Sequence, residues 1–352
     1  MISNMAQRSF LPRLVTVLLM IAAITSCDAG AETLYAVVLG NPKFVVGSST
    51  LHSGLFASRD GGRSWTHMGP ENLKAYSMDG VDASGGGTLY IAAGNGVHKS
   101  TDSGRSWKIV TDWRITEVLD VKVDQRNPGR VFAATAYGFW VSTDGGASWD
   151  RPIAPPAEGY IYRLAYRDRQ VIILGDSGVS RFEPEIGVGT FSSEDRMPAP
   201  RALVEIPPFG TIVSTVGSPT LNRLAYLRSP DPYASGSLPR APGPRERGLA
   251  RALLQAPTMN IYDLLLSGSP DSMLYAAGDA GVHAIPASFA SSWKDLTGSL
   301  PNRMVHALAW LPSSGTLMAG TFGDGVFRRE RSGWVAAGLD GGQIWRLVVK
   351  PW

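Results

Sequence analysis

The sequence feature that most limits the fold is an eight-residue segment that occurs three times at a fixed spacing. Its aspartates, Asp60, Asp102 and Asp144, follow one another at intervals of 42 residues. A fixed period of this size indicates one supersecondary unit that is repeated along the chain. The repeats must therefore be identified before domains are counted. The three segments are SRDGGRSW at Ser58–Trp65, STDSGRSW at Ser100–Trp107 and STDGGASW at Ser142–Trp149.

The residues before each segment predict β-hairpins. LYIAAGNGVHKS at Leu89–Ser100 and VFAATAYGFWVS at Val131–Ser142 each contain two runs of apolar and β-branched residues that are separated by a glycine turn. Such pairs of runs are typical of hairpins. A further apolar strand precedes the hairpin, as in EVLDVKV at Glu117–Val123. The unit is therefore predicted to be a small antiparallel sheet, and the glycines and β-branched runs exclude helical repeats.

The number of units predicts a closed ring. A glycine followed by a large apolar residue recurs with steps of 42, 42, 40, 103 and 44 residues, and the large step contains one additional unit. The last strand, Ile344–Lys350, has no hairpin after it, and the first hairpin, which begins at Leu34, has no strand before it. We therefore predict an all-β, seven-bladed β-propeller at 33–352 that is closed by pairing the N- and C-terminal strands. The apolar residues of this pattern are Leu55, Val97, Phe139, Val179, Val282 and Val326.

One unit carries an insertion at 228–257. The segment is rich in Pro, Gly, Ser and Arg and is predicted to be a long loop without regular structure. Such loops are usually functional or disordered. Arg245, Arg247 and Arg251 give it a basic character, which suits an acidic partner surface. A solvated loop that tolerates sequence change explains the same composition equally well.

A column of charged residues crosses the predicted inner strands. Alignment of these strands places Asp120, Arg163, Asp263 and Arg346 at the same position, with Ala307 in another unit. The inner strands of a propeller line its central channel, so the four side chains are expected to form a polar ring. The charges either neutralise one another in a water-filled tunnel or form a small binding site at the channel mouth.

The repeated segment itself is explained by turn chemistry. Its aspartate is expected to accept hydrogen bonds from nearby backbone amides, its glycine to adopt a positive φ, and its tryptophan to cover the end of the hairpin. We therefore assign these residues a structural rather than a catalytic role. The residues concerned are Ser58, Asp60, Gly62, Trp65, Ser100, Asp102, Gly104, Trp107, Ser142, Asp144, Gly146 and Trp149.

The pattern Ser-x-Asp-x-Gly-x-x-Trp resembles the Asp-box (BNR) repeat of sialidases, sortilin-type propellers, xyloglucan-cleaving glycosidases and the photosystem II stability/assembly-factor-like family. The last resemblance implies a non-catalytic protein-binding or assembly scaffold, which is our favoured interpretation. The alternative is an exo-sialidase-like or glucanase-like glycoside hydrolase that acts on exported or extracellular glycans. A sialidase would need three arginines that clamp the sugar carboxylate and a Tyr/Glu pair, and the chain lacks the Arg-Ile-Pro motif of that family. We predict no catalytic residues, no metal site and no cofactor.

The N-terminus predicts export. Arg8 and Arg13 precede an apolar run of 11 residues, and Ile24-Thr25-Ser26 precedes Cys27, the only cysteine. This arrangement resembles a bacterial lipobox, which implies a signal peptide at 1–26, acylation of Cys27 and a linker at 27–32. An ordinary signal peptide cleaved near Ala29 or Ala31 is the alternative.

These features place the protein in the bacterial cell envelope. We expect it to be bound to the membrane only through its lipid anchor, with another envelope or membrane protein as the partner and a glycan as a further candidate ligand. Removal of the signal leaves 31 basic and 30 acidic residues. This near-neutral balance argues against nucleic-acid binding.

Overall fold

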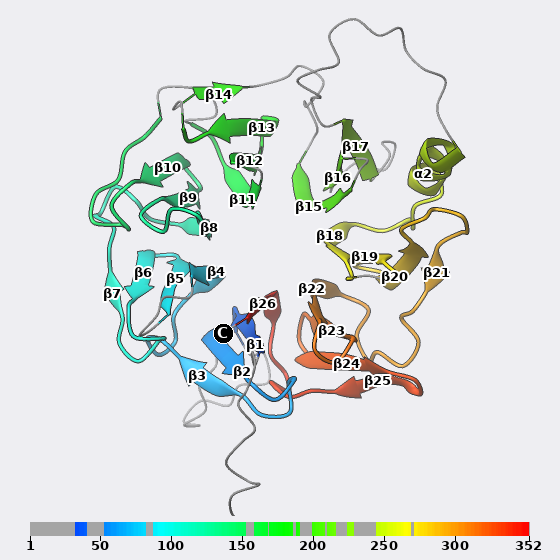
Figure 1. Ribbon diagram of the computed structural model, residues 1–352. Coiled ribbons are helices and arrows are strands. Elements are labelled where there is room, and N and C mark those ends of the chain that lie inside the picture. The colour runs from blue at the N-terminus through cyan, green and yellow to red at the C-terminus, as the bar shows by residue number, and fades with distance from the viewer. Residues whose placement is uncertain are drawn as a thin grey trace, which may run out of the picture.

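The protein forms a ring of small sheets around a central axis (Figure 1). The computed structural model describes residues 32–40, 53–81, 87–152, 158–167, 169–185, 188–190, 199–207, 210–215, 224–228, 244–268 and 271–351. The prediction of an all-β propeller is confirmed. The predicted signal peptide, Cys27 and most of the linker at 27–32 lie outside the described residues.

The described strands form seven antiparallel sheets, five with four strands and two with three. The first sheet contains β26 (Ile344–Pro351), β1 (Glu32–Val38), β2 (Gly54–Ser58) and β3 (Thr66–Met68). The second contains β4 (Ala75–Val81), β5 (Thr88–Ala93), β6 (Gly96–Ser100) and β7 (Lys108–Ile109), and the third β8 (Val118–Val123), β9 (Val131–Thr135) and β10 (Gly138–Ser142). The fourth contains β11 (Ile161–Arg167), β12 (Gln170–Gly175), β13 (Gly178–Glu183) and β14 (Val188–Thr190), and the fifth β15 (Pro200–Ile206), β16 (Gly210–Thr215) and β17 (Leu224–Arg228). The sixth contains β18 (Ile261–Leu266), β19 (Met273–Gly278), β20 (Gly281–Pro286) and β21 (Lys294–Asp295), and the seventh β22 (Val305–Leu311), β23 (Thr316–Thr321), β24 (Val326–Glu330) and β25 (Gly333–Ala336).

The ring closes where the two ends of the propeller meet. Strand β26 pairs with β1 along its length, from Pro351 opposite Glu32 to Ile344 opposite Val38. Ile344 is completely buried, because the sheet packs against its neighbours on both faces. The prediction that these two strands complete one sheet is confirmed.

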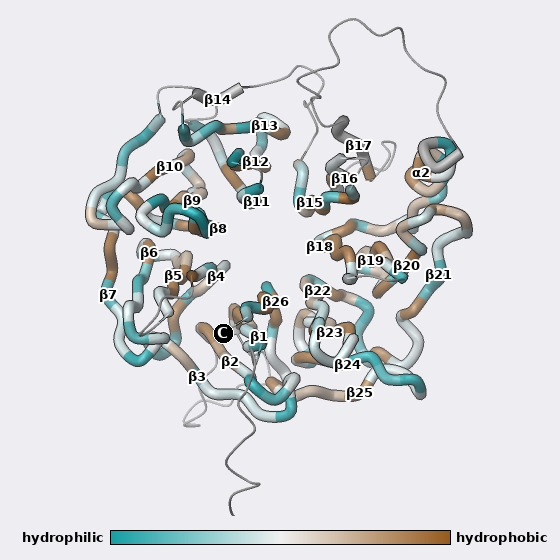
Figure 2. Tube along the Cα trace, in the orientation of Figure 1, coloured by the Kyte–Doolittle hydropathy of each residue, from teal (hydrophilic) through white to brown (hydrophobic). Residues whose placement is uncertain are grey.

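The core lies between adjacent sheets rather than in one central mass. All five residues of β9 are buried. Tyr90 and Ala92 of β5 pack with Val121 of β8 and Ala133 of β9 in one such interface. Figure 2 shows that the hydrophobic residues are concentrated in the strands of the ring. Burial of both faces is complete in middle strands such as β9, whereas the inner strand β15 alternates between buried and partly exposed residues.

Every inner strand contains a register shift near its start. These shifts determine which side chains face the end of the channel. In β18 the register shifts between Ile261 and Asp263, so that Tyr262 is the extra residue of a β-bulge. Bulges redirect side chains at sheet edges. The shift recurs at the equivalent place in all seven inner strands. The seven bulge residues are Tyr76, Leu119, Tyr162, Arg201, Tyr262, His306 and Trp345.

The insertion at 228–257 contains a helix, α2 (Pro244–Leu254), at the outside of the ring (Figure 1). Leu249 and Ala252 are buried against the fifth and sixth sheets, and Trp293 donates a hydrogen bond of 2.9 Å to the carbonyl oxygen of Ala252. The prediction of a loop without regular structure is therefore wrong for this part of the insertion. Its apolar residues have helical spacing, which the Pro- and Gly-rich flanks conceal.

Candidate functional site

The three repeated segments form the same turn. Ser58 donates a hydrogen bond of 2.7 Å to Asp60 and accepts one of 2.8 Å from the backbone amide of Gly62. Gly62 has a φ of 85°, which a side chain would strain. The other two copies repeat these contacts. Hydrogen bonds from Ser106 hold the pKa of Asp102 well below its usual range, so the carboxylate is ionised and held within the turn.

Two of the three tryptophans of these turns donate hydrogen bonds to a neighbouring part of the ring. The indole of Trp65 donates a hydrogen bond of 2.6 Å to the carbonyl oxygen of Ala337, which directly follows β25 of the seventh sheet. Trp149 donates one of 2.9 Å to the carbonyl oxygen of Val110, which follows β7. Trp107 bonds within its own turn, to Gly104 at 3.0 Å. The geometry of the repeat is that of structural turns that brace adjacent blades.

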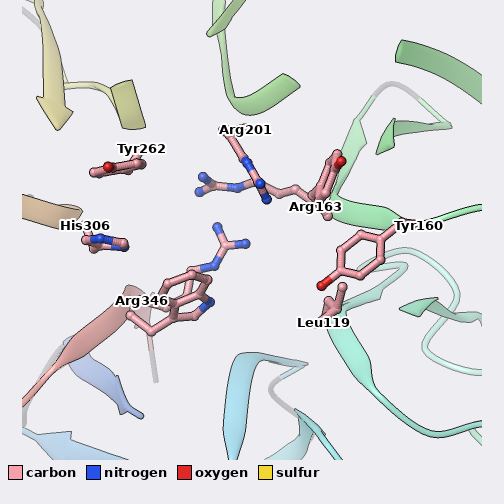
Figure 3. Close-up of a pocket in the computed structure, with 9 residues that line it drawn as sticks. Leu119, Tyr160, Arg163, Arg201, Tyr262, His306 and Arg346 are labelled. Atoms are coloured by element: carbon pink, nitrogen blue, oxygen red, sulfur yellow. The ribbon is translucent and has the colours of Figure 1, made fainter. Parts of the chain in front are cut away.

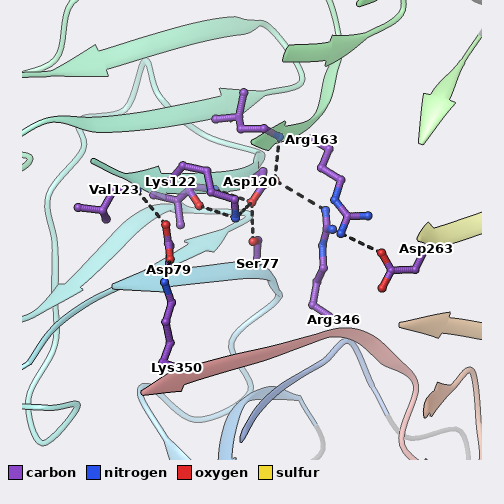
Figure 4. A network of polar contacts seen from close by, with 11 residues as sticks. Ser77, Asp79, Asp120, Lys122, Val123, Arg163, Asp263, Arg346 and Lys350 are labelled. Carbon is purple, nitrogen blue, oxygen red and sulfur yellow. Dashed lines mark hydrogen bonds and ion pairs between the residues drawn. The ribbon is translucent and has the colours of Figure 1, made fainter. Parts of the chain in front are cut away.

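The charged column is a hydrogen-bonded network, and Asp120 is its most buried member (Figure 4). The side chain of Asp120 has no exposed surface. It accepts hydrogen bonds from the hydroxyl of Ser77 at 2.5 Å and from the backbone amide of Leu164, in the next sheet, at 2.9 Å. Lys122 and Arg346 lie 3.3 and 3.8 Å from its oxygens. Burial opposes ionisation, but the two cations and the hydrogen bonds outweigh it and lower the pKa of Asp120.

Asp263 repeats this arrangement on the other side of the channel. It accepts a hydrogen bond of 2.8 Å from the backbone amide of Leu308, which lies in the next sheet. Its other oxygen accepts one of 3.0 Å from Arg163. Arg163 reaches it across the fifth sheet because the residue at the equivalent position there is the small Ala202. Asp120 and Asp263 therefore link neighbouring blades, and Asp263 also lines a cavity at the other end of the channel.

The arginines, by contrast, face a pocket of about 200 Å³ at the end of the channel where the inner strands begin. Figure 3 shows the guanidinium groups of Arg163, Arg201 and Arg346 directed into this space. Nine of the described residues line it, and none of these nine is acidic. Six of the nine are bulge residues, so the register shift repeated around the ring builds the pocket. The lining residues are Leu119, Tyr160, Tyr162, Arg163, Arg201, Tyr262, His306, Trp345 and Arg346.

Aromatic rings hold this lining in place. The guanidinium of Arg201 lies 4.1 Å from the ring centre of Tyr162. His306 stacks on Tyr262 with ring centres 4.3 Å apart and lies 5.0 Å from Trp345. The contact with Tyr162 orients Arg201 without neutralising it. The pocket therefore combines aromatic rings with three guanidinium groups, of which those of Arg163 and Arg346 are also paired with Asp263 and Asp120.

Burial shifts the ionisation of two lining residues. It lowers the pKa of His306 to about 4, with Arg346 adding to the decrease and Asp263 opposing it, so the imidazole is neutral at pH 7. Burial also lowers the pKa of Arg346 to about 10, with Arg163 lowering it further and the two aspartates raising it. Arg346 remains charged at neutral pH. Among the described residues its buried Nε has no hydrogen-bond partner.

The channel opens into a second cavity at the opposite end. This cavity has a volume of about 860 Å³ and is lined mainly by apolar residues, among them Leu266, Trp310 and Val349. Arg163 lines both cavities. The ion pair between Arg163 and Asp263 therefore lies between the two openings of the channel.

The structure brings together some of the predicted site residues and separates others. Arg163 and Arg346 lie in the pocket, whereas Asp120 and Asp263 serve the fold. Arg247 and Arg251 lie exposed on α2, as part of the outer rim, and Arg245 is on the same helix.

Sequence reasoning missed Arg201 and the aromatic bulge residues. The sequence contained a signal for them, because the residue just before the aligned column of inner-strand positions is large in every unit. The pattern is Tyr76, Leu119, Tyr162, Arg201, Tyr262, His306 and Trp345.

The fold resembles several solved propellers. It superposes on the Dos1 propeller with a TM-score of 0.55 at 14% identity, covering 89% of this chain and 86% of that one. For YCF48 bound to a D1 peptide the TM-score is 0.47 at 13% identity, covering 92% and 97%. For an ancestral GH74 enzyme it is 0.40 at 14% identity, and the likeness covers 90% of this chain but 40% of the enzyme. At these identities the likeness concerns the fold alone.

No protein-family model and no curated protein sequence matches the chain. Within the described residues, no helix is long and apolar enough to span a membrane. The same part of the chain contains no group of three or more His, Cys, Asp or Glu side chains suited to hold a metal ion.

Proposed function

We propose that this protein is a non-catalytic binding propeller whose pocket, lined by arginines and aromatic rings, takes an anionic group from a partner protein. The observation that carries the proposal is the convergence of three guanidinium groups on one pocket whose described lining residues include no acid, although Arg163 and Arg346 also contact Asp263 and Asp120 behind it. Guanidinium groups bind carboxylates and phosphates through paired, charge-assisted hydrogen bonds. The partner remains an envelope or membrane protein in this proposal.

The burial of Arg346 and its unpaired donor atom support this proposal. Its side chain is 13% exposed, and its Nε has no partner among the described residues. A buried donor without a partner costs about 1–3 kcal/mol, which a bound anion would recover. A pocket of about 200 Å³ accepts a single side chain or a chain end rather than a folded surface. The partner is therefore expected to present a protruding segment.

The same geometry argues against hydrolysis by a carboxylate pair. Most glycosidases need two carboxyl groups that flank the scissile bond. Asp120 and Asp263 each accept a backbone amide of the next blade and contact a cation, so their oxygens are occupied. They provide blade contacts instead of an acid and a nucleophile.

One observation favours a second candidate, an exo-sialidase-like hydrolase. The resemblance to sialidases implies three arginines around the sugar carboxylate, and three arginines meet in this pocket. Sialidases use a tyrosine nucleophile. Tyr160 lines the pocket, and nearby Tyr76 donates a hydrogen bond of 3.4 Å to Glu117. Release of fluorophore from a fluorogenic sialoside at enzyme-like rates would replace the binding proposal with this one.

The test of the binding site is the variant Arg201→Met. Methionine keeps the contact with Tyr162 but removes the charge, so we expect at least a tenfold loss of partner capture from solubilised membranes, as is typical of an arginine hot spot. The matched control is Arg247→Glu/Arg251→Glu on α2, where both side chains are exposed. We expect the control to keep full capture. Loss of capture in the α2 variant alone would move the site to the insertion.

The lipid anchor would orient this pocket. Glu32 pairs with Pro351 at the end of β26, whereas Trp345 and Arg346 near its start line the pocket. Five residues span at most about 17 Å, so a lipid on Cys27 would hold the opposite face of the ring near the membrane. The pocket would then face away from the membrane that holds the anchor.

Mass spectrometry of the mature N-terminus tests the anchor. We expect an acylated Cys27, since two or more acyl chains give stable membrane attachment. An unmodified N-terminus at Ala31 would contradict lipidation and leave the pocket proposal unchanged.

A further inference from the structure

Three large aromatic side chains are exposed on the face of the ring that contains the pocket. Trp113 is 85% exposed, Tyr137 58% and Tyr160 41%. We call these three residues the aromatic ridge. Aromatic side chains contribute large apolar area when they are buried, so exposure of this extent is typical of an interaction surface.

The topology places the ridge on one face. Trp113 lies in the segment that leads into β8, and Tyr137 lies in the turn between β9 and β10. That turn is beside the start of β8, because Val118 pairs with Thr135. Tyr160 directly precedes β11 in the next sheet and lines the pocket. The ridge therefore lies on loops of one face, from the segment between the second and third sheets at Trp113 to the pocket at Tyr160.

Hydrogen bonds and a contact between two rings hold the ridge in place. The amide of Ala136 donates to the carbonyl oxygen of Glu117 at 3.1 Å, which ties the β9–β10 turn to the segment after Trp113. Arg151 donates a hydrogen bond of 3.0 Å to the carbonyl oxygen of Tyr137. The ring of Tyr160 lies tilted against the ring of Tyr162, with ring centres 5.1 Å apart. A surface that is already ordered loses little conformational entropy on binding.

We propose that the aromatic ridge continues the binding site, and that it takes an extended apolar segment of the partner polypeptide whose acidic group enters the pocket. This inference rests on the proposed function. Trp, Tyr and Arg are the residues that dominate the energy of protein interfaces, and the ridge and pocket together present all three. The positive pocket complements an acidic group, and the adjoining ridge complements apolar side chains next to it.

The lipid anchor proposed at Cys27 favours a polypeptide over a lipid surface as the occupant. Glu32 lies at the opposite end of β1 from the pocket, so a membrane anchor that precedes it approaches the other face. An aromatic surface that inserted into the same membrane would need to lie beside the anchor. The ridge is therefore placed to contact a partner that stands away from that membrane.

Dodecapeptides selected by phage display on the purified mature protein provide the probe. The best peptide is synthesised with a fluorophore, and its Kd is measured for wild type and for Trp113→Ala/Tyr137→Ala. We expect selected peptides to combine an acidic group with apolar residues, and the double variant to raise Kd by about tenfold. Tyr160 is left intact so that the pocket is unchanged. The matched control is Leu254→Ala on α2, which removes a side chain that is 71% exposed and should leave Kd unchanged.

The outcomes separate the ridge from the pocket. If the ridge variant binds within twofold of wild type while Arg201→Met binds weakly, the ridge proposal falls and the pocket stands. If neither variant changes Kd, or if no peptide binds wild type, the ridge proposal also falls. Vesicles of phosphatidylcholine and phosphatidylglycerol test the lipid alternative. Vesicle binding that Trp113→Ala abolishes would assign the ridge to a membrane and overturn the polypeptide assignment.

Discussion

A chain that ends at Gln343 is expected to lose cooperative folding. The truncation removes β26, which pairs with β1 over its whole length and supplies the buried side chains of Ile344 and Leu347. Full burial of a side chain of this size contributes about 1.5–3 kcal/mol. The truncation also removes Lys350, which forms an ion pair with Asp79. Because domains are stable by only about 5–15 kcal/mol, the combined loss approaches the whole stability of the ring.

Thermal unfolding followed by circular dichroism checks this expectation. The truncated chain should show no cooperative transition and should aggregate, because β1 becomes an exposed apolar edge strand. A synthetic peptide of residues 344–352 added in excess should restore the transition in part. A melting temperature equal to that of the full chain would show that pairing of β1 with β26 contributes nothing to stability.

The second large effect is expected from Asp120→Ala, which should destabilise the protein by about 3–5 kcal/mol. The substitution leaves the amide of Leu164 and the charges of Lys122 and Arg346 without their buried acceptor. Urea unfolding at pH 7 measures the change. Asp271→Ala removes an exposed carboxylate and is the matched control, with an expected change within about 0.5 kcal/mol.

The pH dependence of the stability provides a second test of the role of Asp120. The pKa of Asp120 is lowered below 3.8 in the folded protein, so the unfolded chain binds the proton at a higher pH. Its stabilising contribution is therefore present above pH 3.8 and is lost as the pH falls through the folded value. Asp120→Asn should lack this acid-sensitive component. An equal loss of stability in wild type and variant on acidification would contradict the role of Asp120 as a buried anion.

The repeat made the architecture predictable from sequence because hairpin chemistry is local. The spacing of Asp60, Asp102 and Asp144 and the two unpartnered terminal strands were sufficient to predict a closed ring. Helix α2 was missed because the Pro- and Gly-rich residues around it dominate the composition of the insertion.

The site was only partly predictable, because its geometry depends on contacts between blades. Alignment placed four charges in one column, yet only the structure shows that Asp120 and Asp263 bind amides of the next sheet. Arg201 was not predicted as a site residue because its unit has Ala202, and no charged residue, at the aligned inner-strand position. A β-bulge changes which residue faces the channel, and sequence spacing alone does not show a register shift.

The most direct test of the arginine pocket as the binding site is photo-crosslinking from Tyr262. This residue lines the pocket, and p-benzoylphenylalanine preserves its aromatic ring. The control position is Leu254, which is exposed on α2. In intact cells we expect the Tyr262 probe to crosslink one envelope or membrane protein through an acidic segment, and the Leu254 probe to give no product. Capture of the same protein from Leu254 and not from Tyr262 would contradict the account.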